Sequence, residues 1–246
     1  MENTTYIALS RLDTQQRAMD VIANNIANAN TDGYKAQRVL FSDYLSKQHG
    51  VDAPAGGTTL SYTQDRATYL DQQDGSLSQT GNPLDMALAG PGFFTVSTAA
   101  GPRLTRSGRF GMLPDGRIAD ASGNLLLDTG GNPLQLSPSD TQIRIAGDGT
   151  ISTENGPVGK LGVVTVDDTN QLMPEGGKLY RAAAETTPVA LPKVTQGVVE
   201  SSNVQPITEL TRMMQTEKEF QFVSQFIESE GQRQQSAIDK IVPQQG

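Results

Sequence analysis

The distribution of glycine and proline limits what this chain can fold into more than any other feature of its sequence. Residues 1–32 and 207–230 contain neither residue type, whereas most of the 25 glycines and 13 prolines fall within residues 81–199. Both residue types destabilise helices, and turns use them. The sequence therefore predicts a helix at each end of the chain and a turn-rich region between the two helices.

Each predicted helix carries an apolar seam in which residues recur every seven positions, with a second set offset by three. Such spacing is typical of coiled coils. In the first helix, residues 4–29, the seam consists of Leu12, Met19 and Ile26 with Ala8, Gln15, Ile22 and Ala29. In the last helix, residues 204–242, it consists of Met213, Phe220, Ile227, Gln234 and Ile241 with Thr216, Val223, Glu230 and Ala237, and Leu210 and Met214 widen it. Ser201, Ser202 and Asn203 offer oxygens that could cap the last helix.

The length of the two helices indicates how their seams are buried. At 1.5 Å per residue each helix is ~40–55 Å long, which exceeds what a compact domain of this size needs. Pairing the two termini side by side would bury both seams, so we expect a coiled-coil-like helical domain made of residues 1–35 and 200–246. Two ordinary amphipathic helices packed on the middle of the chain would give a similar pattern.

The middle of the chain has the pattern of a β domain. Short apolar runs at 93–96, 125–127, 143–145 and 161–166 alternate with turn signals such as Asp-Gly and Gly-Asn pairs. We therefore expect an antiparallel, sandwich-like or barrel-like β domain over residues 76–199, which makes the fold class α+β. Residues 36–75 form a linker or extended arm, with a loop-like stretch at 49–59 and a short helix or strand near Val39.

Composition excludes several classes of partner. The net charge of −8 and the pI of about 4.7 argue against nucleic acid and against an anionic membrane surface, because both need clustered basic residues. The longest apolar stretch, residues 86–96, is broken by Gly90, Pro91 and Gly92, so we expect no membrane insertion. The N-terminus lacks the basic start and apolar stretch of a cleaved signal peptide.

Residues with catalytic or metal-binding chemistry are few. The chain has no cysteine and one histidine, His49, without partners at metal-ligand or nucleophile spacing. The acidic pairs Asp167–Asp168 and Asp71–Asp74 sit beside turn residues, where aspartate commonly closes a loop. We expect no catalytic residues, no metal site and no cofactor.

Asparagine is unexpectedly frequent in the segment IANNIANANTDGYK, residues 22–35. Its amide competes for backbone groups, which makes it a mediocre helix former. Buried amides at a helix interface can fix register and partner choice, so Asn24, Asn25 and Asn28 are candidates for that role. A polar, fraying helix end is the alternative. Gly33 is the expected left-handed residue after the helix.

Four segments of the chain resemble the signatures of flagellar rod and hook proteins, and they occur in the order of that family. They are IANNIANANTDGYK, then SQTGNPLDMALAGPGFFTV at 78–96, LTRSGRFGMLPDGRIADASGNLLL at 104–127, and QGVVESSNVQPITELTRMMQTEKEFQFVSQFI at 196–227. Within the family, the length and residues 147–164 are most similar to proximal rod subunits, with distal rod subunits as the alternative.

The resemblance implies a structural, non-catalytic subunit of the basal-body rod, the drive shaft of the flagellum. Such subunits leave the cytoplasm through the flagellar type III export apparatus without a cleaved signal peptide. They assemble helically with copies of themselves and with other rod proteins in the periplasm-spanning rod, where the paired terminal helices lie on the inside.

The residues expected to make the assembly interface come from both helices and from the Ser-Asn-Val motif. They are Leu12, Met19, Ile22, Asn24, Asn25, Ile26, Asn28, Asn203, Met213, Phe220, Val223 and Ile227. Because neighbouring subunits complete the seams, the terminal helices are expected to be poorly ordered in the free monomer. Two other hypotheses compete with a rod subunit. One is a flagellum-independent binding module with helical arms, and the other is a hydrolase built on a β scaffold.

Overall fold

The computed structural model describes residues 2–47, 59–176 and 178–241 of the chain. These residues form two compact units. The helical unit consists of residues 1–26, 37–68 and 206–246, and the β unit consists of residues 27–36 and 69–205. The chain therefore passes between the units four times, after residues 26, 36, 68 and 205. Residues 49–58 of the stretch expected to be loop-like, including His49, lie outside the described residues.

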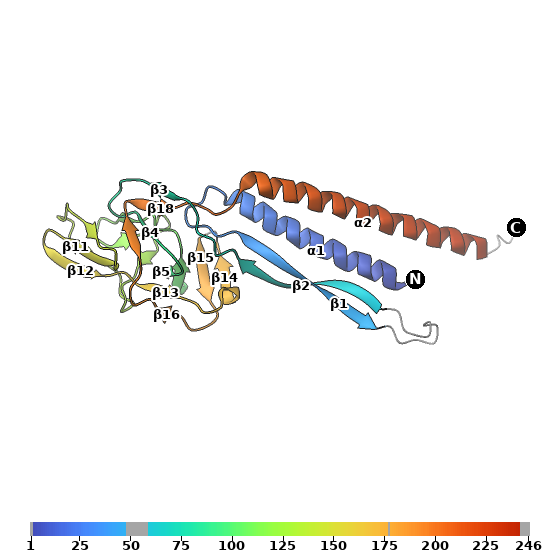
Figure 1. Cartoon of the computed structure of the whole chain (residues 1–246), viewed down its shortest axis with the longest axis horizontal. Coiled ribbons are helices and arrows are strands. Elements are labelled where there is room, and N and C mark those ends of the chain that lie inside the picture. The colour runs from blue at the N-terminus through green and yellow to red at the C-terminus, as the bar shows by residue number, and fades with distance from the viewer. Residues whose placement is uncertain (1, 48–58, 177, 242–246) are drawn as a thin grey trace. The chain divides into compact units, whose positions relative to one another are not determined.

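The helical unit contains both long helices of the chain (Figure 1). Helix α1 spans Glu2–Ala27 and helix α2 spans Pro206–Ile241, each within two residues of the expected bounds at either end. Proline is tolerated at the first helical position because its missing N–H would have no partner there. Helix α2 continues through Gly231. Strands β1, Gln37–Lys47, and β2, Thr59–Leu70, form a two-stranded sheet where we expected an arm.

The β unit is built from short antiparallel strands. Its large sheet has the order β14-β15-β6-β5-β9-β8-β7, with β13 pairing β5 and β16. The strands of this sheet are β5 (Phe93–Thr98), β6 (Gly101–Thr105), β7 (Gly111–Met112), β8 (Ile118–Ala119), β9 (Leu125–Leu126), β13 (Val163–Thr165), β14 (Leu172–Glu175), β15 (Leu179–Ala182) and β16 (Thr187–Pro188).

Smaller sheets complete the β unit. Strands β10 (Arg144–Ile145), β11 (Thr150–Thr153) and β12 (Gly156–Lys160) form one sheet. The strands nearest the two ends of the unit pair with each other: β3 (Leu77–Gln79) with β18 (Val198–Glu200), and β4 (Met86–Leu88) with β17 (Val194–Gln196). A 3₁₀ turn, η1, spans Thr169–Gln171. The expected α+β class and antiparallel β region are confirmed, while the sandwich or barrel form stays a prediction.

Turn glycines and buried aromatic rings explain why these residues fold this way. The predicted turns close at Gly116, Gly123 and Gly149, all with positive φ, a conformation that costs glycine nothing. Phe94 is fully buried and meets Phe110 edge to face, with ring centroids 5.8 Å apart. Around them lies the main core of the β unit: Leu84, Met86, Leu88, Val96, Ile118, Leu126, Leu134, Leu136, Ile145, Ile151, Leu161, Val163 and Val194.

Candidate functional site

Helices α1 and α2 contact each other in an antiparallel arrangement. The Gln15 amide donates to the Glu219 carboxylate at 3.3 Å, and the Asn25 amide donates to the Glu209 carboxylate at 3.4 Å. From Gln15 to Asn25 the chain advances ten residues along α1, and their partners Glu219 and Glu209 lie ten residues apart in the reverse order along α2. The two helices therefore run antiparallel. Figure 1 shows the two helices running alongside each other in opposite directions.

A buried glutamate, Glu209, organises the polar end of this helix pair. Its side chain is fully buried and accepts hydrogen bonds from Arg38 on β1 at 2.6 Å and from Arg212 at 2.9 Å. Asn25 adds a third contact and also exchanges two 2.9 Å hydrogen bonds with the Gln37 backbone. The cluster therefore joins both helices to the start of β1. A buried carboxylate needs such partners, because burying it unpaired costs several kcal/mol.

The predicted interface residues differ widely in burial. Ile22, Asn25 and Val223 are buried, and Asn24 is exposed. Of the three candidate asparagines, Asn25 is the buried one, and its amide donates to Glu209 on α2. The remaining predicted residues are half-buried: Leu12, Met19, Ile26, Asn28, Asn203, Met213, Phe220 and Ile227. Within this set of predicted residues, Asn25 joins the two helices through its hydrogen bond to Glu209 on α2.

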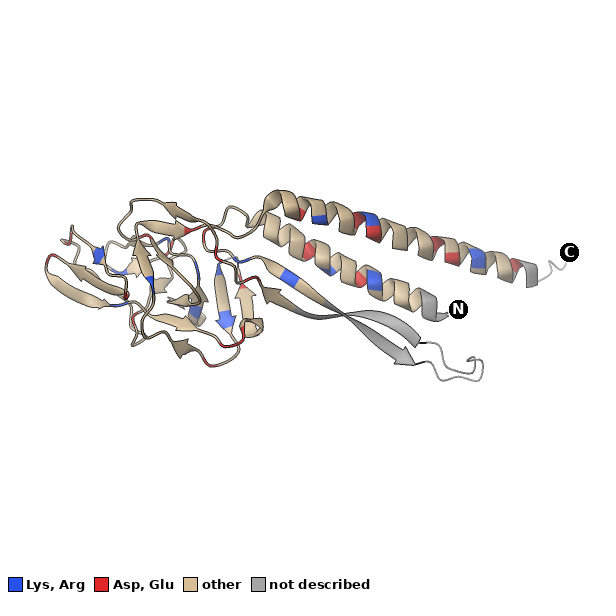
Figure 2. Ribbon diagram, viewed as in Figure 1, with Lys and Arg blue, Asp and Glu red and all other residues tan. Residues whose placement is uncertain are grey.

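Helix α2 carries a second apolar face, which is exposed. Ile207 is 82% and Phe222 is 72% exposed. Leu210 and Met214 are exposed with them, so the expectation that these two residues widen the buried seam is wrong. On a helix with 3.6 residues per turn, Ile207 and Met214 lie opposite the face that holds Glu209, Phe220 and Val223, and Leu210 and Phe222 lie at the two sides between these faces. Figure 2 shows basic and acidic residues interspersed along both helices.

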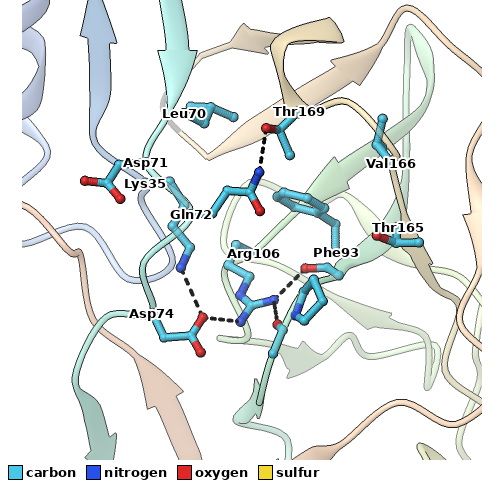
Figure 3. Close-up of a pocket in the computed structure, with 13 residues that line it drawn as sticks. Lys35, Leu70, Asp71, Gln72, Asp74, Phe93, Arg106, Thr165, Val166 and Thr169 are labelled. Atoms are coloured by element: carbon cyan, nitrogen blue, oxygen red, sulfur yellow. Dashed lines mark hydrogen bonds and ion pairs between the residues drawn. The ribbon is translucent and has the colours of Figure 1, made fainter.

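The β unit contains a second buried glutamate, Glu200, at the end of β18. One of its carboxylate oxygens accepts hydrogen bonds from Lys35 at 2.7 Å and from the Gly75 backbone at 2.9 Å, and the other accepts one from Arg106 at 2.6 Å. Lys35, Arg106 and Glu200 all have side chains at most 6% exposed. Asp74 contacts both cations (Figure 3), so two positive and two negative charges balance.

Arg106 uses its whole guanidinium group in this cluster. Besides Glu200 and Asp74, it donates to the carbonyl oxygens of Leu88, Gly90 and Gly92 at 2.6–2.8 Å. All five N–H groups of the side chain thus have partners, which is the condition under which a buried arginine is tolerated. Arg106 therefore holds the Gly90-Pro91-Gly92 loop in place by hydrogen bonds to the carbonyl oxygens of Gly90 and Gly92.

Asn203 connects its own segment to two other segments of the β unit. Its side-chain oxygen accepts from the Ala36 backbone at 2.7 Å, and its amide donates to the carbonyl oxygens of Asp71 and Gln73. These contacts explain why Asn203 does not cap α2, which begins at Pro206. Its assignment to the assembly interface stays a prediction.

A pocket of about 260 Å³ lies beside the Glu200 cluster, within the β unit. Its polar lining includes Lys35, Asp74 and Arg106, and Gln72 hydrogen-bonds Thr169 at 2.8 Å along it (Figure 3). Nearby, burial raises the pKa of the Tyr180 hydroxyl to about 12; a backbone group of Lys35 partly opposes the shift and the Glu200 charge adds to it. The phenol therefore stays neutral and packs edge to face on Phe93.

The acidic pairs singled out in the sequence have structural partners. Asp168 caps η1 by accepting from the Asn170 backbone, and Asp71 accepts from the Gln73 backbone. Across residues 2–47, 59–176 and 178–241, no three histidine, cysteine or acidic side chains gather as a metal site. No helix in the same described part of the chain is long and apolar enough to cross a membrane.

Comparison with known proteins gives this architecture a family. Residues 6–35 match the "Flagella basal body rod protein" family, residues 87–153 match the "Flagellar hook protein FlgE/F/G D1 domain", and residues 195–240 match the "Flagellar basal body rod FlgEFG protein C-terminal" family. These matches contain three of the four signature segments in whole and residues 87–96 of the segment at 78–96.

Relatives match the chain over nearly its full length. The flagellar basal-body rod protein FlgF of Caulobacter vibrioides is 32% identical over 98% of both chains, and that of Mesorhizobium japonicum is 35% identical over 90% of both. FlgG of Bacillus subtilis is 31% identical over 92% of this chain and 94% of its own. The chain belongs to the flagellar basal-body rod protein family, whose members are structural subunits of the rod and not enzymes. It is a component of the flagellar basal body and assembles with other rod proteins.

The sequence did not reveal the two buried glutamates, although one of them left a signal. Glu209 lies four residues before Met213 and seven before Thr216, so it occupies a seam position of the heptad pattern. An acid at such a position predicts a buried polar partner. Glu200 leaves no comparable signal, because its partners Lys35 and Arg106 are 165 and 94 residues away in the chain.

Proposed function

We propose that the chain is a subunit of the proximal rod that assembles helically with copies of itself and with related rod proteins. Support for the proximal position comes from the relatives named FlgF, which are 32–35% identical over almost the whole chain. The distal rod is the alternative, since the relatives named FlgG are nearly as similar. A binding module with helical arms would instead form a discrete oligomer. Observation of such an oligomer would contradict both the proximal and the distal rod assignment.

One observation carries this proposal: α2 presents apolar side chains on two opposite faces. Its contacts with α1 use Glu209 and Glu219, whereas Ile207 and Met214 are exposed on the side of the helix opposite Glu209. A single partner helix cannot cover both. A patch on one copy that binds a different patch on the next copy gives a contact that repeats without closing, and hence a helical assembly.

The seam residues are proposed to act in two groups. Leu12, Met19, Ile22 and Ile26 on α1 would pair in coiled-coil fashion with Met213, Phe220, Val223 and Ile227 on α2, within one subunit or between neighbours. Asn25, with Glu209, would fix the register of that pairing. Most of these side chains are only half-buried in the single chain, which supports their completion by neighbouring subunits.

The route to the rod follows from the family. We infer export through the flagellar type III apparatus, with the terminal helices gaining most of their order on assembly. The absence of cysteine suits a chain that is threaded in an unfolded state. No catalytic activity and no cofactor are part of this function.

The test is electron microscopy of basal bodies from a strain that lacks this chain, complemented with variants. Without the chain we expect rods that stop short and carry no hook, with a stopping point that separates proximal from distal. Phe220→Asp should fail to restore the rod while the β unit stays folded in the purified protein. Leu191→Asp, which changes an exposed apolar residue of the β unit, is the matched control and should restore it. Complete rods and hooks in the deletion strain would refute the proposal.

A further inference from the structure

All four passages of the chain between its two units are gathered at one place inside the β unit. Ala36 and Asp71 lie next to two of the passages, and the Asp71 N–H donates a 2.8 Å hydrogen bond to the Ala36 carbonyl. Asn203 lies next to the third passage, which leads into α2, and its side chain hydrogen-bonds the backbones of both Ala36 and Asp71. Ala29, near the fourth, packs on a small apolar cluster of Tyr34, Ala36 and Val204. We call this group of segments, residues 29–36, 70–75 and 200–204, the crossing cluster.

Backbone hydrogen bonds alone hold these segments weakly. The Gly33 N–H donates to the Glu200 carbonyl at 2.7 Å, and the Ser201 N–H donates to the Ser76 carbonyl at 2.8 Å. Each such bond adds about 1 kcal/mol net. The apolar part is also small, since it consists of one tyrosine and three small or medium side chains. Something stronger is needed if the segments are to resist separation.

Glu200 supplies that strength from the last strand of the unit. Its carboxylate bonds Lys35 in the first segment, Gly75 in the second and Arg106 in the β sheet region. Gly33 and Gly75 allow the close approach, since a Cβ on Gly33 would lie 2.3 Å from the Ser107 backbone and one on Gly75 would lie 1.9 Å from the Ser201 carbonyl oxygen. Pulling any one segment away would strand buried charges, which is costly.

We propose that Glu200 and Asn203 close a mechanical clamp in the β unit. The clamp holds together the segments that lead into α1, β1, β2 and α2, so that a pull on any one of them passes into the β core and does not peel that segment away. Because the clamp lies within the β unit, it forms whether or not the helices are assembled. In a subunit of a rotating rod, it is the point through which force on the terminal segments reaches the β unit.

Hydrogen exchange on the full-length protein tests whether the clamp holds the segments. Glu200→Gln keeps the shape but removes the charge, and it should speed exchange of the Gly33, Gly75 and Ser201 amides by roughly tenfold or more. Amides of the β5–β6 pair should change little. The matched control is Glu154→Gln, which alters a glutamate that also accepts three hydrogen bonds, from Thr141 and Gln142. Its effect should stay at those two residues.

Pulling experiments test the mechanical part of the proposal. The natural chain has no cysteine, so handles can be attached through Ala27→Cys and Gln205→Cys at the edges of the clamp. At fixed force, Glu200→Gln should shorten the lifetime of the first rupture by roughly tenfold, and Glu154→Gln should leave it unchanged. Should Glu200→Gln fail to fold, Lys35→Gln removes the contacts of the Lys35 ammonium group with Glu200, Asp74 and the Gln73 carbonyl and keeps the Arg106–Glu200 pair. Uniformly faster exchange in the whole β unit, or an unaltered rupture lifetime, would overturn the clamp.

Discussion

Each unit of this protein contains one fully buried glutamate, and the surroundings of the two acids differ sharply. The β unit, which holds Glu200, also contains two clusters of buried apolar side chains. Glu209 in the helical unit is surrounded by helices whose described apolar residues are mostly half-buried or exposed. The first unit stabilises its buried charge within the single chain. In the second unit the buried Glu209 is paired with Arg38, Arg212 and Asn25, and we propose that neighbouring subunits complete the apolar core around it.

The largest expected effect comes from truncating a core aromatic ring in the β unit. Phe94→Ala removes a fully buried ring that packs on Phe110 and should lower the free energy of unfolding of this unit by about 3–5 kcal/mol. Val223→Ala in the helical unit should cost about 1 kcal/mol or less in the free protein, because its surroundings are incomplete. Calorimetry of both variants measures the difference. Equal losses would contradict the comparison.

Removing Glu209 is expected to have the second largest effect. Glu209→Ala leaves the Arg38 and Asn25 side chains without their shared acceptor and should destabilise the helical unit by roughly 2–3 kcal/mol, less than a fully buried pair because both arginines are partly exposed. Far-UV circular dichroism during denaturation reports this loss. Glu217→Ala, on the exposed side of α2, is the control and should have little effect. A helix signal that melts identically in both variants would count against the register role.

A pair of turn glycines gives a smaller and sharper comparison inside the β unit. Gly116 and Gly123 both have positive φ, but a Cβ on Gly116 would lie 2.1 Å from the Leu136 carbonyl oxygen, whereas Gly123 has open space. Gly123→Ala should cost about 1–2 kcal/mol for its backbone conformation alone, and Gly116→Ala should cost more. Thermal unfolding of the two variants measures both losses of stability. A larger loss for Gly123→Ala than for Gly116→Ala would show that the backbone around Gly116 shifts to accommodate the added Cβ.

The smallest expected effect is a pH dependence at an exposed site. Backbone N–H groups, the Thr141 N–H first among them, lower the pKa of Glu154 from 4.5 to about 2. A carboxyl group whose pKa is lowered on folding stabilises the folded state above its unfolded pKa, and the stabilisation disappears as pH falls through the folded value. The stability difference between wild type and Glu154→Gln should therefore be constant near neutral pH and shrink between pH 4.5 and about 2. A difference that does not change with pH would refute this role.

The sequence predicted the parts of the fold that local chemistry determines. Both helices follow from the absence of glycine and proline, and turns such as those at Gly116 and Gly149 follow from their Asp-Gly pairs. The buried acids could not be predicted in the same way. Glu200 depends on Lys35 and Arg106, and Glu209 depends on Arg38, which is 171 residues away. Contacts between residues so far apart depend on the strand pairing, which no local pattern specifies.

The candidate interface shows the same division. The heptad spacing correctly placed Ile22 and Val223 on buried faces, because a helix repeats its geometry regularly. It could not show that Leu210 and Met214 are exposed on α2, since both fit an extended seam as well as a second stripe. Asn25 was grouped with Asn24 and Asn28, and only its partners Glu209 and Gln37 distinguish it from them.

The gathering of Ala36, Asp71 and Asn203 has a consequence for how such a chain can change over generations. A region whose chain arrives and departs at neighbouring points can be lengthened, shortened or exchanged without altering the path of the segments outside it. Insertions and deletions between residues 76 and 199 are therefore expected to be inherited without disturbing the helices that flank them. Substitutions at Lys35, Glu200 and Asn203 do not have that freedom, because every passage of the chain depends on them.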